Sequence, residues 1–181
     1  MDAIEQFKNE KLKKSLERSE EADKLRMQFV REFPIGKIES MSMNDYLLTV
    51  DGVGNQKSFC RQLIYDLNIL ASKGNTYPNI FGIYLKGGIE LKLSPTFSKI
   101  YGENFESAFV GIKTEIVELL NNAEKDDLQG IGECKLNISF ILRLLIVYFP
   151  EKFIPVCTES AIEGYCSSVG LTSNGQGKQI Y

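Results

Sequence analysis

Residues 80–94 of the chain read IFGIYLKGGIELKLS, a pattern that predicts a β-hairpin. Two short apolar runs, Ile80 to Lys86 and Ile89 to Ser94, flank Gly87-Gly88, which has the two-residue spacing of a tight turn. Apolar and polar residues alternate in the second run: Ile89, Leu91 and Leu93 against Glu90, Lys92 and Ser94. Because successive side chains of a strand point to opposite faces, we expect one buried face and one solvated face.

Helical patterns lie on both sides of this hairpin. Apolar residues recur at near-helical intervals from 2 to about 32, and Phe33-Pro34 should end that helix because proline disfavours a helical residue before it. Ser42, three residues before Asp45, has the spacing of an N-cap for a short helix that includes Leu48. Further apolar stripes predict helices at 58–71, 103–124 and 136–148.

These elements predict an α+β fold: a predominantly helical single domain with a small antiparallel β element, the hairpin at about 80–94, and a long N-terminal helix. We divide the chain into an N-terminal amphipathic helix at 1–32, a globular domain at 33–171 and the start of a polar linker at 172–181. The hydrophobic fraction of 43% is that of a chain that buries a core, since disordered chains contain fewer apolar residues.

The composition excludes several classes of site. The 181 residues include no histidine, which removes Ser-His-Asp and Cys-His nucleophiles and histidine-ligated metals. The four cysteines, at positions 60, 134, 157 and 166, form no C-x-x-C pair of the kind that binds zinc. No phosphate-binding glycine motif is present, so we expect no nucleotide site and no cofactor. The apolar run at 138–149 is shorter than the roughly 20 residues that cross a bilayer, and no signal sequence opens the chain, so we expect a cytoplasmic protein without a membrane partner.

A local basic and aromatic surface is the main candidate for binding. The net charge of −3 disfavours a non-specific polyanion binder, so any contact with DNA must be local. Lysine and arginine bind phosphates, asparagine pairs with adenine, and aromatic rings stack on bases. Ordinary solubilising lysines and core aromatics are the alternative interpretation. The candidate DNA-binding residues are Lys57, Arg61, Lys73, Asn75, Tyr77, Lys86, Lys92, Lys99 and Tyr101.

For Arg61 the sequence predicts two distinct roles, a phosphate contact or a structural ion pair. It follows Lys57 by four positions, so on one helix the two would present adjacent charges, and both would contact phosphate if that face meets DNA. In the alternative, the Arg61 stem packs at the edge of the core and its guanidinium pairs with an acid such as Asp66 or Glu90.

Two other functions compete with DNA recognition. Glu90-Leu91-Lys92 on a strand has the acid and lysine spacing of PD-(D/E)xK nucleases, although the solvated face of a hairpin explains the same residues. The N-terminal helix could form a coiled coil with a second copy or dock a partner subunit, although its irregular stripe between Leu16 and Leu25 favours packing on the core of its own domain.

Four blocks of sequence together resemble the N-terminal domain that precedes the AAA+ motor in McrB-like restriction subunits. Their order and spacing cover about residues 28–171. The blocks are Phe33-Pro34 with Met41-Ser42-Met43-Asn44-Asp45-Tyr46, then Lys57-Ser58-Phe59-Cys60, then Phe81-Gly82-Ile83-Tyr84, then Val147-Tyr148-Phe149-Pro150-Glu151-Lys152-Phe153-Ile154-Pro155-Val156. They are similar to family motifs of the type MTxxEY, SFC, KFGIY and YxPxKFLPI.

The resemblance implies a module of a modification-dependent restriction system that acts in anti-phage defence. In that group the N-terminal domain selects the DNA, a AAA+ domain in the same protein hydrolyses nucleotide, and a separate subunit cuts. It therefore implies that this stretch recognises DNA, with a modified base as one candidate target, and has no catalytic activity of its own. The expected partners are DNA, a AAA+ motor domain in cis and a separate nuclease subunit.

Overall fold

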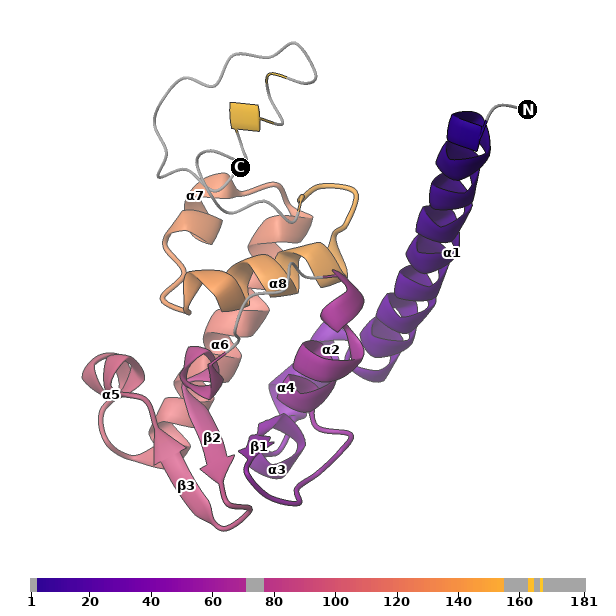
Figure 1. The fold of residues 1–181 in the computed structure, drawn as a ribbon. Coiled ribbons are helices and arrows are strands. Elements are labelled where there is room, and N and C mark those ends of the chain that lie inside the picture. Colours follow the sequence, from indigo (N-terminus) through magenta and orange to yellow (C-terminus); the bar gives the residue numbers. More distant parts are fainter. Residues whose placement is uncertain (1–2, 71–76, 155–162, 165–166, 168–181) are drawn as a thin grey trace.

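The predicted hairpin is present as strands β2 (Ile83–Lys86) and β3 (Glu90–Leu93), which pair antiparallel. The computed structural model describes residues 3–70, 77–154, 163–164 and 167 (Figure 1). Lys86 pairs with Glu90, so the turn contains three residues, 87–89, and not the two that the sequence predicted. Gly87 and Gly88 both have positive φ, 63° and 77°, which glycine adopts without steric cost. The longer turn removes Ile89 from the buried face and leaves it in solvent.

A third strand, β1 (Leu48–Val50), pairs parallel with β2 and gives the sheet order β1-β2-β3. The sequence had placed Leu48 in a helix, and this is wrong. Helix α3 (Met43–Tyr46) is a single turn in which the Ser42 hydroxyl oxygen accepts from the backbone N–H of Asp45 at 3.2 Å, as predicted. The chain becomes extended at Leu47, because pairing with β2 satisfies the backbone of the next three residues.

Helices form most of the rest of the described chain, and the predictions for 103–124 and 136–148 are confirmed. Helix α6 packs against α2, α5, α7 and α8, so it is the central helix of the domain (Figure 1). The elements are α2 (Ile35–Ser40), η3 (Pro78–Phe81), α5 (Pro95–Tyr101), α6 (Phe105–Glu124), α7 (Leu128–Gly132) and α8 (Ile138–Tyr148). A predominantly helical α+β domain with a small sheet is therefore what the chain forms, although the sheet is mixed.

The helix predicted at 58–71 is broken into three short pieces. They are α4 (Phe59–Arg61), the π-helical η1 (Gln62–Asp66) and the 3-10 helix η2 (Asn68–Leu70). The backbone N–H of Leu67 donates to the Gln62 carbonyl at 3.1 Å, which closes the wider turn. Arg143 of α8 donates to the Leu63 carbonyl at 3.0 Å, so a side chain from another helix supports this irregular segment.

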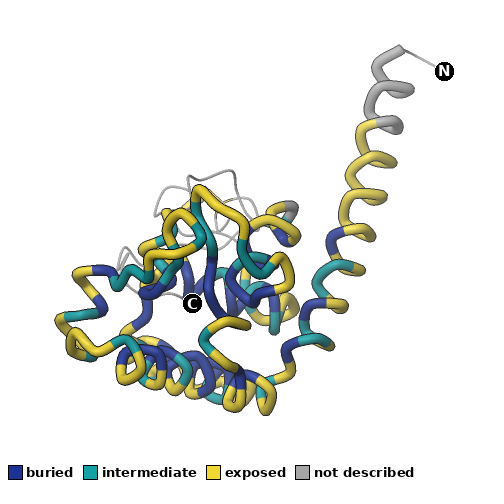
Figure 2. Tube along the Cα trace, turned by 90° about the horizontal axis from the view of Figure 1, so that it is seen from below, coloured by how far each residue is buried: buried dark blue, intermediate teal, exposed yellow. Residues whose placement is uncertain are grey.

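Helix α1 (Ala3–Glu32) confirms the long N-terminal helix, but only its C-terminal part belongs to the core. Ala22, Phe29 and Phe33 are buried, whereas every residue from 11 to 21 is exposed. Figures 1 and 2 show this part of α1 standing away from the domain. The expectation that the helix packs on its own core therefore holds for 22–33 and is wrong for 11–21. No helix in the described ranges has the length and apolar character of a membrane span.

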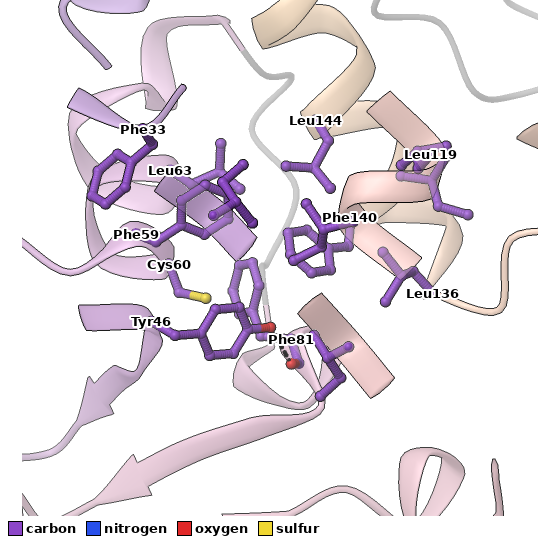
Figure 3. Packing of buried hydrophobic residues seen from close by; sticks show 14 of the residues in the cluster. Phe33, Tyr46, Phe59, Cys60, Leu63, Phe81, Leu119, Leu136, Phe140 and Leu144 are labelled. Atoms are coloured by element: carbon purple, nitrogen blue, oxygen red, sulfur yellow. Dashed lines mark hydrogen bonds between the residues drawn. The ribbon is translucent and has the colours of Figure 1, made fainter. Parts of the chain in front are cut away.

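The core is organised around the corner formed by Phe81 and Gly82. The buried Tyr46 hydroxyl donates to the Phe81 carbonyl at 2.5 Å, and the Phe81 ring packs edge-on against Phe140 at 4.8 Å between centroids (Figure 3). Gly82 has a φ of 79°, and a Cβ there would lie 2.6 Å from the Phe97 ring and 2.7 Å from Ile112. Only glycine fits this corner.

Two further contacts attach the ends of the described chain to this core. The Tyr148 hydroxyl donates to the Phe33 carbonyl at 2.5 Å, which joins α8 to the end of α1. The Lys152 ammonium donates to the carbonyls of Ala123 and Glu124 at 3.0 and 2.9 Å. A cation at this place stabilises the C-terminus of α6, where carbonyls lack intrahelical partners.

Replacing Gly82 should test the corner directly. We expect Gly82→Ala to lower the free energy of unfolding by about 2 kcal/mol or more, because the new Cβ meets Phe97 and Ile112 at a positive φ. Gly36→Ala in α2 is the matched control: nothing lies within 4 Å of its Cβ position, so stability should stay the same or rise by up to about 1 kcal/mol. Urea unfolding of both variants measures this, and equal midpoints would contradict it.

Candidate nucleic-acid interface

The register of the hairpin places Lys86 and Lys92 on one face. Lys92 lies opposite Tyr84, and Lys86 lies opposite Glu90, so these four side chains share a face that we call the hairpin face. The two lysines are diagonal neighbours, which on an antiparallel pair are about 7–8 Å apart. Lys86 is exposed, and Tyr84 and Lys92 are half-buried. The hairpin face therefore presents two cations beside an aromatic ring.

Glu90 reduces the net charge of the hairpin face. The Lys92 ammonium donates to the Glu90 carboxylate, and this hydrogen bond holds the pKa of Glu90 below its ordinary value. Within the described ranges, no three His, Cys, Asp or Glu side chains gather as a metal would require. The Glu90–Lys92 pair is thus an exposed ion pair on a strand, and its use in a nuclease stays a prediction.

Lys57 and Arg61 do not share a helical face. Lys57 is exposed and precedes the Ser58 cap of α4, with its backbone N–H bonded to the Asn55 side chain at 3.0 Å. The Arg61 guanidinium lies 4.0 Å from the centre of the Tyr65 ring and 3.6 Å from an Asp66 carboxylate oxygen. Arg61 therefore has the second of the two arrangements expected from the sequence, in which its guanidinium pairs with Asp66.

The remaining candidates lie apart from the hairpin face or outside the described residues. Tyr77 is exposed just before η3, and Lys99 is exposed on α5. Tyr101 is half-buried, and its ring covers Gly111 so closely that a Cβ there would lie 2.4 Å from it. Burial and the Glu115 carboxylate raise the pKa of Tyr101. Lys73 and Asn75, like the linker predicted at 172–181, lie outside the described residues.

The sequence predictions did not include the two most exposed large apolar residues of the described chain. Val53, in the loop after β1, is 91% exposed, and Ile89, in the hairpin turn, is 90% exposed. Their loops meet: a Cβ on Gly52 would lie 2.5 Å from the Gly87 carbonyl carbon. We call residues 51–54 and 87–89 the two-loop tip, which forms the lower end of the molecule in Figure 1. In each case the sequence offered one signal of this exposure, an aliphatic residue next to glycine in a predicted loop or turn.

The comparisons with known proteins found no relative of this chain. A scan against models of protein families, a search of curated proteins and a search of solved structures each gave no match.

The environment of Arg61 predicts a structural role that Lys57 does not share. We expect Arg61→Ala to lower the free energy of unfolding by about 1 kcal/mol, because it removes the contact with Tyr65 and the pair with Asp66. Lys57→Ala should change stability by less than about 0.5 kcal/mol, since its side chain is exposed. Chemical unfolding of both variants distinguishes them, and an Arg61→Ala protein as stable as the parent would show that neither contact stabilises the fold.

Proposed function

We propose that this chain is a DNA-recognition domain that binds duplex DNA through its hairpin face. The observation that carries the proposal is the pairing register that places Lys86 and Lys92 on one face beside Tyr84. Lysine ammonium groups bind phosphate oxygens and release condensed counterions, which gives affinity without sequence preference.

The wider setting of this proposal comes from the resemblance to McrB-like subunits. In that setting the domain selects DNA, with a modified base as a candidate target, while a AAA+ motor in the same protein and a separate nuclease subunit supply the catalytic steps. The domain itself would need no cofactor, and it would act in the cytoplasm. The net charge of −3 predicts that binding is modest, because few cations oppose a general repulsion.

Removing the lysines of the hairpin face tests the proposal. We expect the wild-type chain to bind a labelled duplex at low salt, and Lys86→Ala to weaken binding to all sequences and reduce the salt slope by about one. Lys92→Ala should also weaken binding to all sequences, because it removes a cation and leaves the Glu90 carboxylate unpaired on the same face. Lys24→Ala is the matched control, since Lys24 is an exposed lysine on α1, a helix that lies apart from the hairpin (Figure 1).

Fluorescence anisotropy across a salt series measures these affinities. Absence of binding at low salt to any duplex, methylated or not, would contradict the proposal. So would an equal loss of affinity in the Lys24→Ala control.

A second candidate function is docking of a partner subunit or a second copy through α1. The observation that favours it is the projecting segment 11–21, in which Leu12 and Leu16 are 60% and 57% exposed. These two leucines are four residues apart, so they lie on the same side of the helix and form a small apolar stripe. Lys13 and Glu17 beside them form an ion pair at 4.0 Å, which is typical of the flank of a helix–helix contact.

The docking function predicts self-association that depends on these leucines. We expect light scattering of the wild-type chain to give a mass above that of the 20.4 kDa monomer, and the double variant Leu12→Gln with Leu16→Gln to be monomeric. The melting temperature should not change, because neither side chain reaches the core. A wild-type chain that is monomeric at all concentrations would exclude the second copy as the partner.

A further inference from the structure

Strand β3 is an outer strand of the sheet. The order β1-β2-β3 places β2 on one side of it, and no described strand lies on the other side (Figure 1). The Ser94 N–H donates to the Gly82 carbonyl at 2.8 Å, so alternate residues from Ser94 back to Glu90 direct their backbone groups toward β2. The N–H and carbonyl groups of Leu91 and Leu93 therefore point away from β2, along the open edge of the sheet.

An open edge of this kind is a template for another strand, and proteins commonly protect it. Proline, a β-bulge, or like charges that would face each other prevent such pairing. Residues 89–93 read IELKL, which contains no proline, and the ladder with β2 runs without a bulge from Lys86–Glu90 to Ile83–Leu93. The two charges of the segment have opposite signs. The four-residue length of β3 limits the strength of pairing at this edge but does not prevent it.

The sequence of β3 is complementary to itself in antiparallel orientation. When Leu91 of one copy lies opposite Leu91 of a second copy, Lys92 lies opposite Glu90, and Leu93 lies opposite Ile89. The outward backbone groups of Leu91 agree with this register, because the two residues of a hydrogen-bonded pair exchange both of their backbone bonds. Centring the pairing on Lys92 would instead place the two lysines opposite each other, which is destabilising. The charges therefore select the register centred on Leu91.

We propose that two copies of this chain associate through antiparallel pairing of their β3 strands, centred on Leu91. The pairing joins the two sheets into one, with the strand order β1-β2-β3-β3-β2-β1. On one face, Glu90 and Lys92 of both copies form a cluster of alternating charges. On the other, Ile89, which is 90% exposed in the single chain, meets the half-buried Leu93 of the second copy. The pairing gives this turn residue an apolar partner, and it does not depend on DNA binding.

Charge reversal within β3 tests the pairing. Because such short strands bury little surface, we expect the wild-type chain to form a weak dimer, with a dissociation constant on the order of 0.1–1 mM. Glu90→Lys places lysines opposite each other at two points of the pairing, and Lys92→Glu does the same with carboxylates. Each variant should weaken association at least about tenfold, because two favourable cross-strand pairs become repulsive. Sedimentation equilibrium over a concentration series measures the dissociation constants.

A mixture of the two variants separates strand pairing from a general effect of charge. One copy then has lysine at both positions and the other has glutamate, so the mixed dimer has opposite charges at each pair. The mixture should associate at least as tightly as the wild-type chain. Lys99→Glu and Glu103→Lys are the matched controls, since they make the same changes of charge at exposed positions outside β3, and their association should stay at the wild-type value. Melting temperatures of all four variants should stay close to the wild-type value, because exposed ion pairs contribute little to stability.

Amide hydrogen exchange at Leu91 adds a local readout, because its N–H points away from β2 in the single chain and is bonded in the pair. Its exchange should slow as the concentration of the wild-type chain rises, and recovery of association in the mixture would support the inference. A chain that stays monomeric up to about 1 mM would overturn it, as would association that survives both charge variants. Association lost only in the variant Leu12→Gln with Leu16→Gln would assign self-association to α1 and also overturn it. Each of these failures leaves the proposed DNA binding intact.

Discussion

The buried carbonyl of Phe81 must have a hydrogen-bond donor, and the fold depends on the way Tyr46 supplies it. An unpaired carbonyl in this position would cost about 1–3 kcal/mol, so the hydroxyl and the carbonyl fix the distance between α3 and η3. Gly82 follows at once, and its carbonyl accepts from the Ser94 N–H at 2.8 Å, which sets where β3 ends and α5 begins. The contact thus places the hairpin relative to the helices, and with it every residue of the hairpin face.

Elements with local signals could be predicted from the sequence, and elements made by distant partners could not. The helices α1, α6 and α8 have their own apolar stripes and stop signals, and the hairpin has its glycine turn. By contrast, β1 exists because Leu48 pairs with Tyr84, 36 positions away. The sequence of its three residues alone does not predict that pairing. The break at Gln62 is similar, since the Arg143 side chain that supports the irregular turn comes from α8.

The candidate site shows the same division between residue type and surroundings. Lys86 and Lys92 could be chosen from the sequence, but their common face depends on a register fixed by the turn. The contact of Arg61 with Tyr65 and of Tyr101 with Gly111 depends on packing that composition does not encode. The blocks that resemble McrB-like subunits contain Tyr46, Phe81 and Tyr148, all of which make core hydrogen bonds or ring contacts. Those blocks therefore report how the chain packs, and the exposed tip lies between them.

The attachment of α1 to the core fixes the distance and the rotational angle of its projecting part relative to the domain. Its last turns are fixed by Phe29 and Phe33, and one uninterrupted helix rises about 1.5 Å per residue. Leu12 is therefore carried about 15 Å beyond Ala22 along a fixed line. A partner bound at Leu12 would be held at a set distance and rotational angle from the sheet. Inserting or deleting one residue between 12 and 22 would turn it by about 100° around the helix axis.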